Sequence, residues 1–316
     1  MTATLRPGSD RTHSAIAANL ICMASMMIWA AALPAAEVLI RADPPVLSPL
    51  WINAGRMVLA ALFLLPIWAL VEGPAALLRA NWLRGIMVGS LIGFGALMLV
   101  LGQGRTSAVM AAVVSSALPL VGMAVEIAFD GRRLTRAVVL GMALSILGGV
   151  LAAGRFDGGL SFGLGALLSL GSVITFTLAS RWTVTALPAM SPLGSTTVTV
   201  CGAAVAALGF ALAGIAFGEP LPGFAAMDWG QIIALVIYGV GGLAISQLLW
   251  IVAVGRLGVA MSALHINMTP FYVMVILLAL GGSWNWLQAA GAGLVCFGVL
   301  IAQGMINARS LRGREA

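Results

Sequence analysis

One pattern occurs twice in the chain, as GRTSAVMAAVVSSALP at residues 104–119 and as GRLGVAMSALHINMTP at residues 255–270, and this repeat indicates the architecture. The glycine-arginine pair, the methionine, one alanine and the proline keep the same spacing in both copies, 151 residues apart. Three glycines downstream, and a Ser-Pro-Leu triplet and a tryptophan upstream, also recur at similar separations. We therefore interpret the chain as two copies of one unit. These further matches are Gly141, Gly148 and Gly154 with Gly291, Gly298 and Gly304, Ser48-Pro49-Leu50 with Ser191-Pro192-Leu193, and Trp82 with Trp229.

Composition identifies the solvent that surrounds most of the chain. Apolar residues make up 61% of it and charged residues 8%, and the mean hydropathy is +1.08. A water-soluble domain could not expose so much apolar surface, so the sequence predicts a multi-pass protein in a lipid bilayer. A spanning helix needs about 20 mostly apolar residues. Runs of about this length lie at 14–40, 48–71, 82–103, 106–129, 136–153, 159–182, 191–217, 229–254, 257–280 and 286–306.

The number of these segments predicts the architecture. Five fall in the first copy, residues 1–154, and five in the second, residues 155–316. A unit with an odd number of spans ends on the opposite side from where it began, so the second copy inserts upside down. The sequence thus predicts an all-α membrane protein with ten transmembrane helices, arranged as two inverted five-helix repeats. Duplication of this kind is typical of transporters.

The arginines predict the orientation, because positive charges favour the cytoplasmic side. With the N-terminus inside, twelve arginines fall on the cytoplasmic side and three on the other, so both termini are expected in the cytoplasm. Arginines at helix ends also account for the net charge of +6 without a nucleic-acid partner. The twelve are Arg6, Arg11, Arg79, Arg84, Arg132, Arg133, Arg136, Arg181, Arg256, Arg309, Arg312 and Arg314, and the three are Arg41, Arg105 and Arg155.

Several residues carry a family likeness: Trp29, Ser48-Pro49 with Arg56, residues 108–119, and Leu134-Thr135 leading into Gly141. With the five-plus-five duplication, they resemble the drug/metabolite transporter superfamily in its EamA-domain branch, and within it the YddG-type amino-acid exporters. The likeness covers nearly the whole chain and is specific for the superfamily more than for a substrate. It implies a bacterial inner-membrane location and export of small metabolites, with aromatic and other amino acids among them.

Arg56 is a charge deep in the second segment, roughly 12 Å from its start at the helical rise of about 1.5 Å per residue. A charge at that depth is costly and indicates a function or a specific partner. Glu37, near the end of the first segment, is the expected partner. Two interpretations stay open: Arg56 is a structural charge that ties the first two segments together, or it contacts the substrate or a gate.

His265 lies near the middle of the ninth segment and is a candidate substrate-binding residue. Met261, Met268 and Tyr272 share its helical face at spacings of three and four residues. Hydrogen bonding to a neighbouring helix and ordinary packing are the alternative roles for this face. Further candidates for substrate contact are Met110 and Val114 in the fourth segment, and Trp250 and Tyr238 in the eighth.

Glycine and proline residues mark where the helices could bend or approach closely. Gly93-Phe94-Gly95 and residues 239–242, which include three glycines, lie near the centres of the third and eighth segments. Such interruptions at corresponding places in two halves point to a site at the membrane midplane, with the third, fourth, eighth and ninth segments as its walls. The expected hinge or packing points are Gly95, Gly242, Pro119 and Pro270.

The residue inventory argues against an enzyme. It contains no paired carboxylates, catalytic triad, metal-binding cluster or phosphate-binding loop, so no catalytic residue, cofactor or metal is expected. A cavity rich in Met, Leu, Ala and Gly suits small neutral or zwitterionic solutes. The sequence therefore predicts a secondary transporter that works by alternating access and does not require an oligomer. A broader drug or purine permease, or a membrane interaction protein without transport, are the alternatives.

Overall fold

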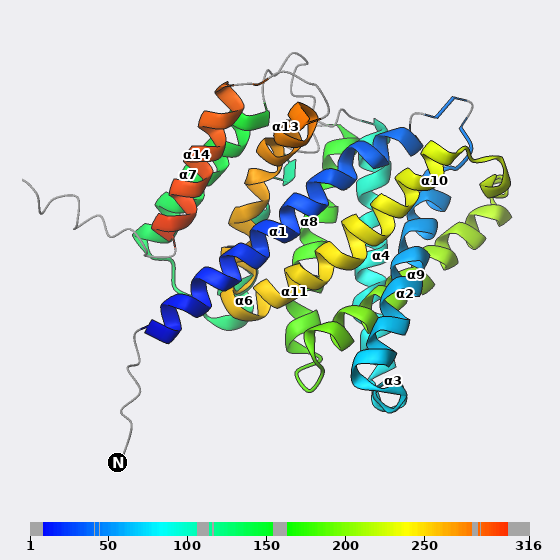
Figure 1. Cartoon of the computed structure of the whole chain (residues 1–316), viewed down its shortest axis with the longest axis horizontal. Helices are drawn as coiled ribbons and strands as arrows, with labels where there is room; N and C mark the ends of the chain where they lie inside the picture. Colours follow the sequence, from blue (N-terminus) through cyan, green and yellow to red (C-terminus); the bar gives the residue numbers. More distant parts are fainter. Residues whose placement is uncertain are drawn as a thin grey trace, which may run out of the picture.

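Helices form all the regular structure in the residues that the computed structural model describes, which are 9–40, 42–43, 45–105, 114–115, 117–153, 163–279, 284 and 286–302 (Figure 1). The elements are α1 (Ser9–Ile40), α2 (Pro49–Glu72), α3 (Pro74–Arg79), α4 (Trp82–Arg105), α6 (Leu118–Asp130), α7 (Arg136–Ala153), α8 (Leu164–Thr185), α9 (Pro192–Ala216), η1 (Phe224–Ala226), α10 (Trp229–Val236), η2 (Ile237–Ile245), α11 (Ser246–Leu257), α12 (Val259–Ala263), η3 (Leu264–Met268), α13 (Thr269–Ala279) and α14 (Trp286–Ala302).

Each of the ten predicted segments overlaps a helix or a run of consecutive helices. The fifth segment begins and ends where it was expected, at Arg136 and Ala153. An all-helical membrane protein is thereby confirmed, with six candidate spans in the described part of the chain and shorter helices over the other segments. The six are Ala15–Ile40, Pro49–Glu72, Trp82–Arg105, Leu167–Thr185, Pro192–Ala216 and Trp229–Leu257.

The repeated Ser-Pro-Leu triplet begins a helix in each half. Pro49 and Pro192 lie in the first turn of α2 and α9, where the missing N–H breaks no helical hydrogen bond. The Ser191 hydroxyl then accepts a hydrogen bond from the Gly194 N–H at 2.9 Å, which satisfies one free donor of the first turn. The repeated triplet is therefore a helix-start signal.

α7 and α14 lie side by side, and glycines permit their backbones to meet (Figure 1). A Cβ added at Gly141 would lie 2.4 Å from the carbonyl oxygen of Gly298. One added at Gly148 would lie 2.5 Å from the carbonyl oxygen of Gly291. A side chain of any size would force the two helices apart at either position. The early glycine of each helix meets the late glycine of the other, so the helices run antiparallel.

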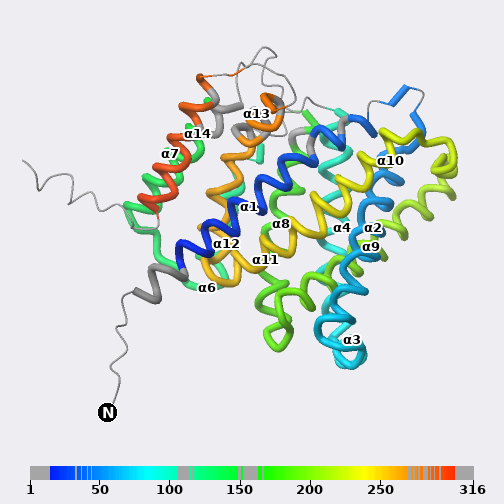
Figure 2. Tube along the Cα trace, viewed as in Figure 1, coloured from blue at the N-terminus to red at the C-terminus, as the bar shows by residue number. Residues whose placement is uncertain are grey.

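Other helix contacts also come in corresponding pairs. α1 packs against η2 and α11, which belong to the eighth segment, while α8 of the sixth segment packs against α4 of the third. Likewise α2 packs against α10 and η2, while α9 packs against α4. If each segment is replaced by its counterpart five segments away, one contact of each pair becomes the other. Figure 2 shows α1 running beside α11 through the middle of the molecule.

Two of the predicted segments leave α-helical geometry in their central part. Ile237–Ile245 in the eighth segment is a π-helix that contains Gly239, Gly241 and Gly242, and Leu264–Met268 in the ninth segment is a 3₁₀ helix. In contrast, Gly93-Phe94-Gly95 lies inside the continuous helix α4. The glycine pattern therefore coincides with an interruption in the second half alone. Single π segments inside α-helices frequently lie at functional sites.

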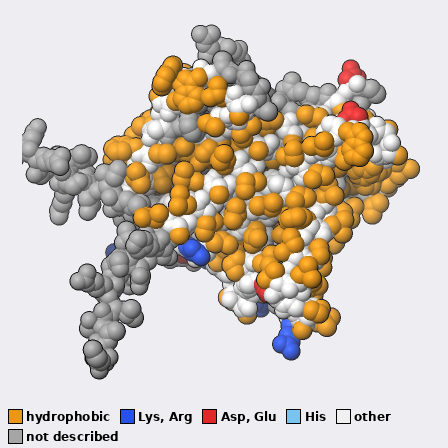
Figure 3. All heavy atoms as spheres, in the orientation of Figure 1, with side chains coloured by type: hydrophobic (Ala, Val, Ile, Leu, Met, Phe, Trp, Pro, Cys, Tyr) orange, Lys and Arg blue, Asp and Glu red, His pale blue; other side chains and the backbone are white. Residues whose placement is uncertain are grey.

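The outer surface is largely apolar. Large hydrophobic side chains such as Leu62 on α2, Met87 on α4 and Val205 on α9 are exposed. Figure 3 shows hydrophobic atoms over most of the visible face. Soluble proteins rarely expose apolar patches of this extent, whereas a helix surface in contact with lipid must be apolar.

Candidate functional site

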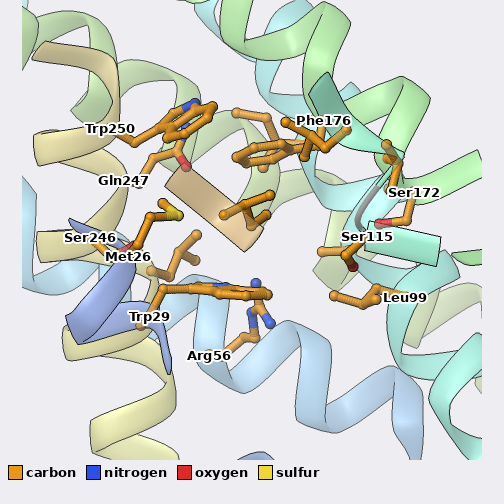
Figure 4. Close-up of a pocket in the computed structure, with 18 residues that line it drawn as sticks. Met26, Trp29, Arg56, Leu99, Ser115, Ser172, Phe176, Ser246, Gln247 and Trp250 are labelled. Carbon is orange, nitrogen blue, oxygen red and sulfur yellow. The ribbon is translucent and has the colours of Figure 1, made fainter. Parts of the chain in front are cut away.

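A cavity of about 90 Å³ lies among helices from seven of the predicted segments (Figure 4). Lining residues come from α4, from Ser115 and α6, from η2 with α11, and from η3, which correspond to the four expected walls. α1, α2 and α8 supply the rest of the lining. The cavity therefore lies where the two halves of the chain meet.

Most of the lining is built from corresponding positions in the two halves. Five pairs of lining residues are separated by 147 positions, and a sixth pair by 151. The first and sixth segments thus present matching faces to the cavity, and so do the third and eighth. The pairs are Met26 and Val173, Trp29 and Phe176, Gly95 and Gly242, Ala96 and Leu243, Leu99 and Ser246, and Ser115 with Ile266.

Among the described residues, Arg56 is the one charged side chain in this lining. It is only 6% exposed, and its guanidinium carbon lies 4.2 Å above the centre of the Tyr238 ring. The Nε atom is buried without a hydrogen-bond partner. No carboxylate in the described part of the chain forms an ion pair with it. Figure 4 shows the guanidinium beside Trp29, at the cavity.

Trp250 and Gln247 line the cavity from α11. Trp250 is held in place because its Nε1–H donates to the Ser180 hydroxyl at 2.9 Å and its ring lies 5.6 Å from that of Phe176. The Nε2 donor of Gln247 is buried without a partner. α11 itself is fixed against α1, since the Ser25 hydroxyl donates to the Ser246 carbonyl at 2.7 Å.

Four of the candidate site residues predicted from the sequence lie in the lining: Arg56, Trp250, Gly95 and Gly242. The two glycines permit close packing. A Cβ added at Gly95 would lie 2.2 Å from the Thr175 hydroxyl of α8, and one at Gly242 would lie 2.3 Å from the Ala32 Cβ of α1. Their expected role as packing points has this geometric basis, and a role as hinges stays a prediction. Tyr238 is not in the lining, but its ring contacts the Arg56 guanidinium.

The lining does not include His265, Met261, Met268 or Tyr272. Met261, Met268 and Tyr272 belong to a buried core cluster that also contains Cys22 of α1, Met142 of α7 and Val295 of α14, and His265 is buried as well. Their expected alignment assumed a continuous α-helix, but Leu264–Met268 is a 3₁₀ helix, in which successive side chains are rotated further around the axis. Ile266 of the same segment reaches the cavity instead.

Pro119 begins a helix in the fourth segment, in the first turn of α6. Pro270 has the same place at the start of α13, directly after η3. Each proline thus follows a local interruption of its segment. Val114 is half-buried beside the lining residue Ser115. Met110 and the side chains of Glu37 and Pro270 lie outside what the structure describes, so their expected roles stay predictions.

Sequence reasoning missed several lining residues. Met26, Trp29 and Phe176 are apolar, and nothing in their sequence positions separates a cavity-facing residue from a lipid-facing one. Gln247 could have been found, because an uncharged amide near the middle of a spanning segment needs a polar environment. It lies within the eighth segment and is only 4% exposed.

Hydrogen bonds and ion pairs join α6 to α12 and α8. Glu126 of α6 is buried, accepts a hydrogen bond from the Ala260 N–H of α12 at 2.9 Å, and forms an ion pair with Arg132. Arg181 of α8 donates to Asp130 through Nε at 3.1 Å. The hydrogen bonds from the Arg181 guanidinium hold the pKa of the Asp130 carboxyl below its usual value. α6 is thereby tied to both α12 and α8.

Comparison with known proteins gives likenesses to a family, to a bacterial protein and to a solved structure. Residues 16–154 match the EamA-like transporter family. The chain is 26% identical over 279 residues to the uncharacterized transporter YyaM of Bacillus subtilis (strain 168), covering 85% of this chain and 88% of the other. A solved crystal structure superimposes with a TM-score of 0.72 at 21% identity, covering 94% of this chain and 99% of the other. The last likeness concerns the fold alone.

Proposed function

We propose that this multi-pass membrane protein is a transporter of the EamA family and not an enzyme, and that it exports small neutral or zwitterionic metabolites by alternating access. Amino acids, aromatic ones included, are the proposed substrates. The proposed setting is a bacterial inner membrane, crossed ten times, with both termini in the cytoplasm. In this proposal residues 1–154 and 155–316 are inverted repeats. The paired helix contacts and the antiparallel glycine contacts of α7 and α14 support that arrangement.

One observation carries the proposal: the cavity lies between the two halves and is lined by corresponding residues of both. Inverted-repeat transporters bind their substrate near the membrane midplane, where the repeats meet, and expose it to each side in turn. The bonds of Glu126 and of Arg181 join α6, α12 and α8 at the end that the arginine distribution assigns to the cytoplasm. We propose that they close this end in the present conformation and open in the other.

The lining supports amino acids over larger or more polar solutes. Trp29, Phe176 and Trp250 offer aromatic faces, and Ser115 and Gln247 are among the few polar groups. A mostly apolar cavity with a few placed polar groups is typical of small-molecule sites. Six further residues stay candidates for substrate contact in another conformation, since the lining changes as the halves move. They are His265, Met261, Met268, Tyr272, Val114 and Met110.

Counterflow in liposomes tests the proposal. Liposomes containing only the purified chain are loaded with unlabelled phenylalanine and diluted into trace labelled phenylalanine. We expect transient accumulation of label, because an exchanging carrier returns labelled substrate as the internal pool leaves. Liposomes without protein provide the control. A panel that adds adenine and an aromatic organic cation tests the alternative of a broader drug or purine permease. No exchange of any solute would favour the other alternative, an interaction protein without transport.

The proposed topology predicts opposite signals from two reporter fusions. A fusion after Arg79 is expected to report the cytoplasm, and one after Asp157, at the junction of the repeats, to report the periplasm. Paired alkaline phosphatase and fluorescent-protein fusions at each site measure this. A cytoplasmic signal at Asp157 would contradict the inverted repeats.

A further inference from the structure

The cavity contains a buried cation whose charge the described structure does not balance. Arg56 is 6% exposed, lines the cavity, and has a buried Nε donor without a hydrogen-bond partner. The Tyr238 ring, 4.2 Å from the guanidinium carbon, is the aromatic contact that stabilises it. A ring face offsets only part of the cost of burying a charge, since cation–π contacts are weaker than ion pairs with good hydrogen bonds.

The fold does not itself require a charge at this place. The Ser-Pro-Leu triplets that begin α2 and α9 align Arg56 with Thr199. Thr199 is fully buried, its hydroxyl donates to the Ser195 carbonyl of its own helix at 2.8 Å, and it does not line the cavity. The corresponding position therefore packs with a small polar residue. Arg56 breaks the correspondence of the two halves at the cavity, where a ligand would meet it.

A second unpaired donor faces the same cavity. The Nε2 of Gln247 is buried without a partner, and Gln247 lines the cavity from α11. Among the described residues, the lining has no Asp or Glu, while Trp29, Phe176 and Trp250 provide aromatic surface. Hydrogen-bond donors and one positive charge are thus available to a ligand, without a carboxylate to attract a cation. Guanidinium groups match the planar, two-oxygen geometry of a carboxylate.

We infer that the cavity selects solutes in which a carboxylate is attached to a small apolar or aromatic body, and that Arg56 binds this carboxylate. The inference rests on the proposed transport function and names the chemical group that it recognises. Zwitterionic amino acids and small organic monoanions both satisfy it. Organic cations do not, because Arg56 repels them and no carboxylate in the described lining pairs with them.

Four probes of almost the same shape test the inference. They are 3-phenylpropionate (anion), phenylalanine (zwitterion), 3-phenylpropanamide (neutral) and 2-phenylethylamine (cation). Binding is measured by calorimetry on the purified full-length chain, and transport by counterflow. The variants are Arg56→Gln, which removes the charge, Arg56→Lys, which keeps it without the planar fork, and Arg105→Gln as a control at the exposed end of α4.

In the unaltered chain, 3-phenylpropionate and phenylalanine are expected to bind and 2-phenylethylamine not to compete with them. Arg56→Gln should weaken the two carboxylates about 10- to 100-fold, the usual effect of losing a hydrogen bond to a charged group, and leave the propanamide within about twofold. The affinity of Arg56→Lys for the two carboxylates should lie between those of Arg56→Gln and the unaltered chain. The affinities of Arg105→Gln should equal those of the unaltered chain. Melting temperatures of all variants establish that they are folded.

Two results would overturn the inference while leaving transport intact. One is equal competition by 2-phenylethylamine and 3-phenylpropionate in the unaltered chain, which requires no variant to fold. The other is a folded Arg56→Gln chain that binds and exchanges carboxylates as the unaltered chain does. The proposed function itself fails on a different result, which is the absence of exchange for all four probes and for the broader panel.

Discussion

Replacing Gly141 by alanine is expected to lower the free energy of unfolding by about 3 kcal/mol, the upper part of the usual range for overpacking. The new Cβ would lie 2.4 Å from the Gly298 carbonyl oxygen, 2.5 Å from the Ala302 Cβ and 2.9 Å from the Ala302 nitrogen. Two of these three atoms belong to the backbone, which cannot move aside as the end of a flexible side chain can. α7 and α14 must therefore separate. Thermal melting of the purified chain in detergent measures the loss.

Gly293→Ala on α14 is the matched control. Gly293 is exposed, and a Cβ added there meets nothing within 4 Å. Alanine is more favourable than glycine inside a helix by roughly 0.5–1 kcal/mol, so this variant should melt at the same temperature as the unaltered chain or slightly higher. Equal melting temperatures for the two variants would mean that α7 and α14 do not pack through their glycines.

The helices could be predicted because few backbone conformations are stable in a membrane. Every backbone group in lipid must be paired within its own segment, so an apolar run of sufficient length becomes a helix. Ends were predictable where local chemistry sets them, as at Pro49 and Pro192. The interruptions at η2 and η3 were harder to predict. Gly93-Phe94-Gly95 and residues 239–242 have similar glycine content, yet only the second stretch departs from α-helical geometry.

The site was predictable to the extent that polarity marks it. Arg56 stood out because a buried charge needs a reason, and the structure places it at the cavity. His265 stood out for the same reason, but it is buried outside the lining of the cavity. A polar residue within a spanning segment avoids lipid equally well in a cavity or between helices, and sequence alone does not separate the two. Trp29 stood out only as part of the family likeness and Phe176 did not stand out at all, because apolar side chains suit both lipid and cavity.

Replacing Leu99 by tryptophan is expected to reduce counterflow more than tenfold while the melting temperature stays within a few degrees. Leu99 lines the cavity from α4, across from Trp250 in Figure 4. The cavity measures about 90 Å³, so an indole projecting into it would occupy space that the substrate needs. The added ring enters an empty space and not a packed contact, and for that reason the fold should tolerate it.

Met87→Trp on the same helix is the matched control. Met87 is 67% exposed, so a tryptophan there faces outward from the helices and leaves the cavity unchanged. Its counterflow should equal that of the unaltered chain. If Leu99→Trp exchanges phenylalanine at the normal rate, the cavity is not the transport path. If both variants lose activity equally, a general effect of tryptophan on α4 explains the loss better than a blocked site does.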